Sequence, residues 1–287
     1  MGFVNSTISL CIICHDRPSE LGRALASAHG FDEVLVLDMA SDPPLLPIDG
    51  VRWMRSDENL GVTEGRNLLA AAASAGILVF LDDDASFASP DPSTAIRRGF
   101  ARGDAPVALA FRVVRSTGVM VSSEYPFRGR PPLHDSARPC AYFLGGAVAI
   151  GRNAFLDAGG YDCRYRYSTE ELDLAFSLQR DGSWIGYDPS IVVEHRPSTL
   201  GRGLNPEVPA LRLRNRLLLV RSHLPWSIAT VHAVAWGIRT FGEALQARSL
   251  RGWLHAWNDG LMLPVVRRPI DYRVLWQLHR RGGRVLW

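Results

Sequence analysis

The 287-residue sequence contains no lysine, so all 32 of its basic side chains are arginines, a bias that we attribute first to genome composition. Cysteine is also scarce. Cys11, Cys14, Cys140 and Cys163 are too few and too scattered for a disulfide framework. Cys11 and Cys14 have the spacing of half a zinc or redox site, but no second Cys/His pair follows at zinc spacing. We therefore interpret them as core residues of an apolar strand.

Long apolar segments are missing too. The nearest candidate, residues 227–238, is shorter than the ~20 residues that a membrane-spanning helix needs, and it contains His232. The N-terminus lacks the basic start and the small-residue cleavage site of a signal peptide. We expect a cytoplasmic enzyme with one large domain, or with one domain and an appendage.

Charge is distributed unevenly along the chain. Residues 1–205 carry 19 basic and 25 acidic side chains, whereas residues 206–287 carry 13 basic and 4 acidic ones. The second stretch also holds six of the eight tryptophans and has helical periodicity over 212–220 and 228–245. We predict two parts: an α/β domain over 1–205 and a basic, Trp-rich helical extension over 206–287.

Two interpretations fit the extension. Arginines with interfacial tryptophans suit peripheral contact with the inner, anionic face of a membrane. The alternative, which we favour, is a helical cap or a homodimer interface in which the tryptophans are core residues. We expect no nucleic-acid partner, because the rest of the chain is acidic and no nucleic-acid motif accompanies the arginines.

Short apolar runs predict strands over residues 8–14, 33–38, 51–54 and 76–81, with helices between them over 19–28 and 63–75. This alternation predicts an α/β fold with a mostly parallel, Rossmann-like central sheet and flanking helices. Further along, we expect an antiparallel pair (105–114 with 118–122), a strand (147–150), a helix (170–180) and two short strands (185–187 and 191–193).

Three consecutive aspartates, Asp82, Asp83 and Asp84, follow the run 76–81. A buried strand cannot hold three uncompensated carboxylates, so they must emerge at its carboxyl end, the edge where open α/β sheets bind ligands. Their oxygens suit a divalent cation that carries a phosphorylated substrate. In an extended segment Asp82 and Asp84 point to one side and Asp83 to the other, so the three cannot share one metal. The alternative is a solvated acidic turn.

Other classes fit less well. Phosphatases of the haloacid dehalogenase type also have an apolar strand followed by Asp-x-Asp, but they need a lysine, which this chain lacks. The Gly-x-Gly-x-x-Gly turn of a dinucleotide-dependent oxidoreductase is missing. A nucleotidyltransferase usually has a Gly-rich phosphate loop after its first strand, where this chain has residues 15–18, His-Asp-Arg-Pro.

The order of the motifs resembles family 2 glycosyltransferases of the GT-A fold. The resemblance covers about residues 7–220, and the segment Arg214-Asn215-Arg216 is similar to one in rhamnosyltransferase-like members. The motifs are His15-Asp16-Arg17, Asp38, Asn59-Leu60-Gly61, Arg66-Asn67, Asp82-Asp83-Asp84, Gly145-Gly146, Gly159-Gly160-Tyr161-Asp162, Glu170-Glu171-Leu172-Asp173-Leu174 and His195.

The resemblance implies an inverting, metal-dependent enzyme that moves a sugar from a UDP- or dTDP-linked donor to a hydroxyl acceptor. The acceptor is a saccharide, a lipid-linked saccharide or a small molecule. Asp84 and His195 match the ligands of Mn²⁺ or Mg²⁺. The matching donor-binding residues are His15, Asp16, Arg17, Asp38, Asn59, Gly61, Arg66, Asp82, Asp83, Gly145 and Gly146. Alternatives remain for three of them: turn caps for Asp16 and Asp38, and a solvated helix arginine for Arg66.

The acidic pair Glu170-Glu171 is the candidate for acid–base chemistry. An acceptor hydroxyl is a weak nucleophile until a nearby carboxylate takes its proton. Most family members have Glu-Asp here, and by position Glu171 occupies the site of the base. The departure leaves the assignment open between Glu171 and Glu170. It also leaves open two alternatives: an acidic first helical turn without catalysis, and a domain that binds a nucleotide sugar without turnover.

Overall fold

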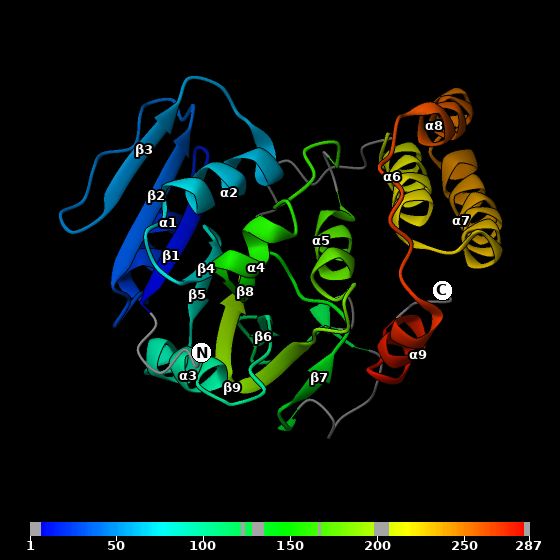
Figure 1. The fold of residues 1–287 in the computed structure, drawn as a ribbon. Coiled ribbons are helices and arrows are strands. Elements are labelled where there is room, and N and C mark those ends of the chain that lie inside the picture. The colour runs from blue at the N-terminus through cyan, green and yellow to red at the C-terminus, as the bar shows by residue number, and fades with distance from the viewer. Residues whose placement is uncertain (1–6, 122–123, 128–134, 166–167, 198–206, 284–287) are drawn as a thin grey trace.

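The computed structural model describes residues 7–121, 124–127, 135–165, 168–197 and 207–283 (Figure 1). Its centre is a nine-stranded sheet in the order β3-β2-β1-β4-β8-β6-β9-β5, with β7 paired to β9. The strands β8, β5 and β7 run against the other six, so the sheet is mostly parallel, as the sequence predicts.

The strands are β1 Ile8–Cys14, β2 Glu33–Met39, β3 Arg52–Ser56, β4 Ile77–Asp82, β5 Ala85–Phe87, β6 Ala108–Val114, β7 Arg138–Cys140, β8 Ala147–Gly151 and β9 Ile185–His195. The helices are α1 Pro18–Ala26, α2 Gly61–Ala72, α3 Pro92–Phe100, α4 Arg152–Asp157, α5 Glu170–Leu178, α6 Val208–His223, α7 Trp226–Gln246, α8 Leu250–Met262 and α9 Tyr272–Arg280.

Both faces of the sheet are covered, which explains why β1 and β4 are continuous apolar runs. Successive side chains of a strand point to opposite faces, so Cys11 and Ile13 pack with α2, α4 and α5, whereas Leu10 and Ile12 pack with α1 and α3. Burial raises the pKa of the Cys11 thiol far above its ordinary value. Cys11 is therefore a core residue, as predicted.

Two sequence predictions about the strands are wrong. Strand β6 does not pair with residues 118–121, which form no strand; it lies between β8 and β9. A turn closed by the bond from the Arg115 amide to the Val119 carbonyl follows β6 instead. The two short strands expected at 185–187 and 191–193 are one strand, β9, whose pairing with β6 shifts register between Phe111 and Arg112.

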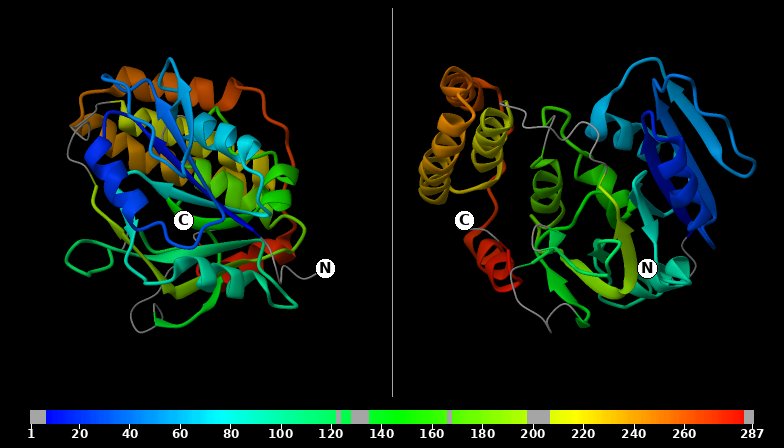
Figure 2. Two further views of the ribbon diagram at one scale, coloured as in Figure 1. Left: turned by 90° about the vertical axis from the view of Figure 1, so that its left-hand side faces the viewer. Right: turned by 180° about the vertical axis from the view of Figure 1, so that it is seen from behind.

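The C-terminal helices form a layer beside the α/β unit (Figure 2). Helix α6 lies between α5 and the hairpin of α7 and α8, and its residues Leu213 and Leu217 pack with Ala256 of α8. The predicted helical extension is confirmed, whereas its boundary at 205/206 and Trp287 lie outside the described residues. Among the described helices, none combines the length and the apolar composition that crossing a membrane requires.

Candidate functional site

The site begins where β4 ends. Asp82 is the last residue of β4, Asp83 and Asp84 follow, and β5 starts at Ala85. Because β5 pairs antiparallel with β9, Ala85 lies opposite His195, the last residue of β9. The Arg196 amide also donates to the carbonyl of Asp84, 2.9 Å away. Strand pairing thus places the imidazole beside the aspartates.

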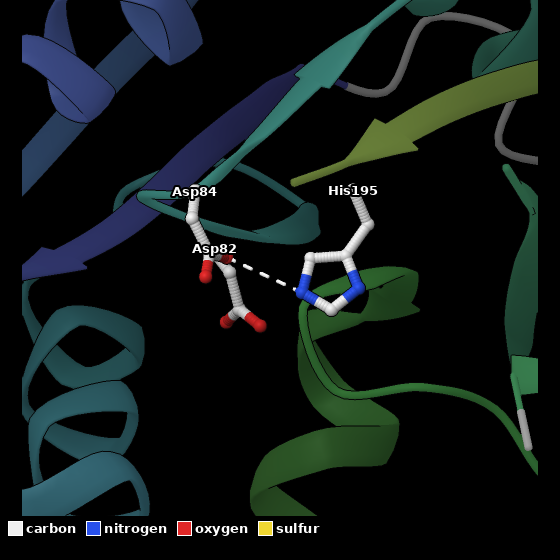
Figure 3. A group of neighbouring side chains, drawn as sticks. All are labelled: Asp82, Asp84 and His195. Carbon is white, nitrogen blue, oxygen red and sulfur yellow. Dashed lines mark ion pairs between the residues drawn. The ribbon is translucent and has the colours of Figure 1, made fainter. Parts of the chain in front are cut away.

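Asp82, Asp84 and His195 converge at this point (Figure 3). Their candidate ligand atoms, two carboxylate oxygens and an imidazole nitrogen, all lie within 4.8 Å of one another. His195 Nε2 is 3.4 Å from Asp84 Oδ1. Two hard oxygen donors with one imidazole are a donor set that fits Mn²⁺, and the two carboxylates alone suit Mg²⁺. Asp82 joins the cluster, although the sequence argument placed it with the donor.

Glu124 orients the imidazole from the other side, a role for which no sequence pattern offered a signal. Its Oε1 lies 2.8 Å from His195 Nδ1 and 2.7 Å from Arg115 Nη2. Burial lowers the pKa of His195, but the hydrogen bonds to Asp84 and Glu124 outweigh it and raise that pKa to about 9. The imidazolium carries positive charge at the place where a cation would, and cation binding at Nε2 would release that proton.

Asp83 is not part of this cluster, although the extended segment assumed for the three aspartates is wrong: Asp83 and Asp84 form a turn between β4 and β5. Arg17 Nη1 donates to Asp83 Oδ1 at 3.0 Å and lies 3.5 Å from Asp84 Oδ2. Burial raises the pKa of Asp83 to about 6, despite the opposing charge of Arg17. Asp83 and Asp84 are only 7% and 6% exposed, so the alternative of a solvated acidic turn is wrong.

Arg66 of α2 is not a solvated helix arginine either. It is 4% exposed, and its Nη2 donates to Asp82 Oδ1 at 2.6 Å. Its guanidinium lies 5.5 Å from the ring centroid of Tyr161. Burial lowers the pKa of Arg66, but the charges of Asp82, Tyr161, Glu171 and Glu170 together outweigh it, so the group stays cationic. Among the described residues its Nη1 has no hydrogen-bond partner.

Two glycines make room for these side chains. A Cβ on Gly146 would overlap the Asp82 carboxylate, and a Cβ on Gly145 would overlap the Arg66 guanidinium. The Gly145 amide donates to Glu171 Oε1 at 2.5 Å. The donor-binding role of both glycines stays a prediction; in the structure, their missing side chains leave the space in which Asp82, Arg66 and Glu171 converge.

Glu170 and Glu171 form the first turn of α5, which the backbone enters through Thr169 in the left-handed region, with a φ of 82°. Burial, followed by the charge of Glu170, raises the pKa of Glu171; burial raises that of Glu170 as well. Glu170 Oε2 has no hydrogen-bond partner among the described residues. Asp173, by contrast, bonds to Tyr165 and His223 and is structural.

The remaining predicted donor residues lie beside the carboxyl ends of β1 and β2, where several of them hold loops. Asp38 accepts hydrogen bonds from the amides of Ser41 and Leu45 and pairs with Arg55, which lowers the pKa of its carboxyl despite burial. It caps a turn, as the alternative proposed. Its contact with a donor stays a prediction.

Three further residues shape the same edge of the sheet. The Asp16 carboxylate accepts from the Asp42 amide at 2.8 Å, and His15 Nδ1 lies 2.6 Å from the Met39 carbonyl oxygen. Asn59 Oδ1 accepts from the amide of Gly61, whose φ of 76° favours glycine. These bonds order the loops after β1, β2 and β3, and the donor-binding roles of these residues stay predictions.

Part of the chain is similar in sequence to known proteins. Residues 9–119 match the sequence model of glycosyl transferase family 2. Proteins from two strains of Mycobacterium tuberculosis, both N-acetylglucosaminyl-diphospho-decaprenol L-rhamnosyltransferases, are 29% identical over 118 residues, which is 41% of this chain. The aligned region spans 38% of the length of these relatives.

Two solved structures share the fold. Staphylococcus aureus TarS 1–349, in complex with UDP-GlcNAc, has a TM-score of 0.61 at 13% identity, covering 95% of this chain and 83% of that one. GalNAc-T7 with UDP, GalNAc and Mn²⁺ has a TM-score of 0.58 at 15% identity, covering 77% and 48%. The fold is therefore the GT-A fold. The match to the glycosyl transferase family 2 model covers β1 to β4 and the three aspartates.

Proposed function

We propose that the protein is a divalent-metal-dependent, inverting glycosyltransferase that uses a UDP- or dTDP-linked sugar as its donor. The observation that carries this proposal is the convergence of Asp82, Asp84 and His195 at one edge of the sheet, within reach of a second acidic group on α5. Asp82 links the metal-binding cluster to the acidic pair on α5. It pairs with Arg66 and adjoins Gly146, and the amide of the neighbouring Gly145 donates to Glu171. Residues 1–205 would form the donor-binding and catalytic domain, with 206–287 as its extension.

At the donor end, the chain holds positive charge where a diphosphate would leave. Asp84, His195 and Asp82 would hold Mn²⁺ or Mg²⁺, which supplies charge neutralisation for the departing nucleoside diphosphate. Arg66 has a buried Nη1 that none of the described residues satisfies, and Arg17 lies beside Asp84. Guanidinium groups bind phosphate oxygens in a bidentate fashion, so both are suited to the leaving group.

At the acceptor end, Glu171 is suited to act as the base. In a single displacement, the bond from the acceptor oxygen to the anomeric carbon forms as the bond from that carbon to the diphosphate oxygen breaks. The hydroxyl proton passes to a Glu171 carboxylate oxygen. Burial and Glu170 raise the pKa of Glu171, which strengthens it as a proton acceptor. The same effects raise the share that is already protonated, so activity should increase with pH.

A donor screen tests the proposal. Release of the nucleoside diphosphate from UDP- and dTDP-sugars is measured with and without chelator, on wild type, Asp84→Ala and Glu171→Gln. Asp104→Ala is the matched control, because this exposed aspartate lies in the loop before β6, outside the site. We expect chelator and both site substitutions to suppress release, and the control to behave as wild type. Unchanged release in Asp84→Ala and Glu171→Gln would contradict the site assignment.

The acceptor panel should include lipid-linked saccharides. The Mycobacterium tuberculosis relatives act on N-acetylglucosaminyl-diphospho-decaprenol, and this chain is 29% identical to them over 118 residues. The second candidate function is nucleotide-sugar binding without turnover, which the Glu-Glu pair in place of Glu-Asp favours. Donor binding in calorimetry with no release for any acceptor would select it.

A further inference from the structure

Helix α7 exposes an apolar stripe to solvent along most of its length. Val231, Val234, Ile238, Phe241 and Leu245 recur at spacings of three and four, so they lie on one face of the helix. All five are exposed, and Ile238 is 71% exposed. A surface helix of a globular protein normally turns such a stripe toward the core, whereas α7 packs its opposite side, with Ala229, Gly237 and Ala244, against the protein.

The stripe continues onto α8. Leu250, Leu254 and Leu261 lie on one face of that helix, and Leu254 is 61% exposed. The rings of Phe241 and Trp253 contact each other at 5.3 Å and join the two helices. Both helices pack on α6 and form the outermost layer on the side away from β1 to β3 (Figures 1 and 2). Exposed apolar rows on two helices that pack together mark an interaction site.

Such a face could bind either a second copy of the chain or a lipid surface, and the charge of the hairpin distinguishes the two. Arg239, Arg248 and Arg251 are exposed on the hairpin, which also holds the acidic residues Glu243 and Asp259. Glu243 pairs with Arg212 and Arg239, which leaves Arg248 and Arg251 as the cations beside the apolar face. A symmetric contact with a second copy would bring this patch against itself and oppose like charges. An anionic lipid surface instead attracts each arginine near it and accepts the apolar side chains between the head groups.

We propose that the outer face of the α7–α8 hairpin, defined by Val231, Val234, Ile238, Phe241, Leu245, Leu250, Leu254 and Leu261, docks on an anionic lipid surface. This inference goes beyond the proposed function and does not depend on it. The hairpin lies in the interface rather than crossing it. The free energy of burying the apolar side chains and that of attraction to anionic head groups add. Full binding therefore requires both the outer face of the α7–α8 hairpin and the arginines beside it.

Vesicle sedimentation of the full chain tests the proposal. The probes are phosphatidylcholine vesicles with and without about 30% phosphatidylglycerol, at low and at physiological salt. Wild type should bind the anionic vesicles, and binding should weaken as salt rises. Ile238→Asp and Leu254→Asp should each weaken binding at least roughly tenfold, because each removes apolar burial and adds a negative charge. Arg248→Gln and Arg251→Gln should each weaken it about fivefold.

Leu156→Asp is the matched control, because Leu156 is an exposed leucine on α4, outside the hairpin, and it should bind as wild type does. Circular dichroism confirms that every variant is folded, and donor turnover in solution stays at the wild-type level in all of them. Failure of wild type to bind anionic vesicles, or wild-type binding by both aspartate variants, overturns the proposal. A stable dimer that Ile238→Asp dissociates overturns it as well, and assigns the face to a second copy.

Discussion

A single added methyl group at Gly146 should disrupt the proposed metal site. The backbone of Gly146 lies outside the left-handed region, so alanine fits its conformation. Its Cβ, however, would overlap the carboxylate of Asp82. Non-bonded carbon atoms settle near 3.5–4.0 Å, so the carboxylate must move by more than ~1 Å. Metal–ligand distances tolerate only about 0.2 Å, so the displaced carboxylate cannot keep its place in the cluster.

The expected loss follows from that displacement. Misplacing groups that orient a metal ligand weakens metal affinity about 10- to 100-fold, or about 1.4–2.7 kcal/mol, and a displaced ligand should reach at least the upper end. Mn²⁺ binding, measured by calorimetry on folded protein, should therefore weaken by about 100-fold in Gly146→Ala. Gly22→Ala is the matched control, because Gly22 lies in α1 with no atom within 4 Å of an added Cβ.

A double-mutant cycle separates this cause from a general loss of stability. Asp82→Asn keeps the volume of the side chain but removes its charge, so it should weaken Mn²⁺ binding by itself. If alanine at Gly146 acts through Asp82, the double variant should bind Mn²⁺ no more weakly than the worse single variant. Wild-type Mn²⁺ affinity in Gly146→Ala, or full additivity in the cycle, would refute the reasoning.

Three further outcomes follow from the site. Glu171→Gln should lower kcat by about 10²–10⁴ without changing donor affinity, and the same substitution at Glu170 should cost less; the reverse order in single-turnover kinetics would make Glu170 the base. Burial and Glu170 raise the pKa of Glu171 in the folded state, so its stabilising contribution is complete below the unfolded-state pKa and is lost as pH rises through the folded-state pKa. Urea unfolding between about pH 5 and pH 8 should therefore show a steeper fall in unfolding free energy for wild type than for Glu171→Gln, and equal slopes would contradict the shift. Glu124→Gln should weaken Mn²⁺ affinity about tenfold or more by releasing His195, as calorimetry would detect, whereas wild-type affinity would show that Glu124 has no orienting role.

The sequence predicted the parallel half of the sheet well, because strands buried on both faces are continuous apolar runs with helices between them. It also grouped Asp82 with Asp84 and apart from Asp83, and the cluster agrees with that grouping, although residues 83–84 form a turn rather than the extended segment that the argument assumed. The partners of β6 could not be predicted in this way. Strand pairing with β8 and β9 is non-local, and nothing in residues 108–114 encodes it.

The environments of individual side chains were harder to predict from the sequence than the strands were. Arg66 looks like any arginine of a surface helix until the fold brings Asp82 to within 2.6 Å of it. Glu124 belongs to a stretch without helical or strand periodicity, so its position beside His195 follows from the tertiary structure alone. Asp38 had two interpretations, and its bonds to two backbone amides show the capping role that local sequence could not separate from ligand binding.

Helix α6 links the C-terminal helices α7 and α8 to the turn that leads into α5. Ser168 and Thr169, which lead into α5, both adopt positive φ angles of 54° and 82°, conformations that cost non-glycine residues on the order of 1 kcal/mol each. The amide of the buried Asn215, from α6, donates to the Ser168 carbonyl at 3.0 Å and holds this turn. Removing the C-terminal helices would thus release the strained entry to α5. The acidic pair therefore depends on a segment to which the proposed reaction assigns no reacting group, and truncation is expected to abolish the proposed sugar transfer.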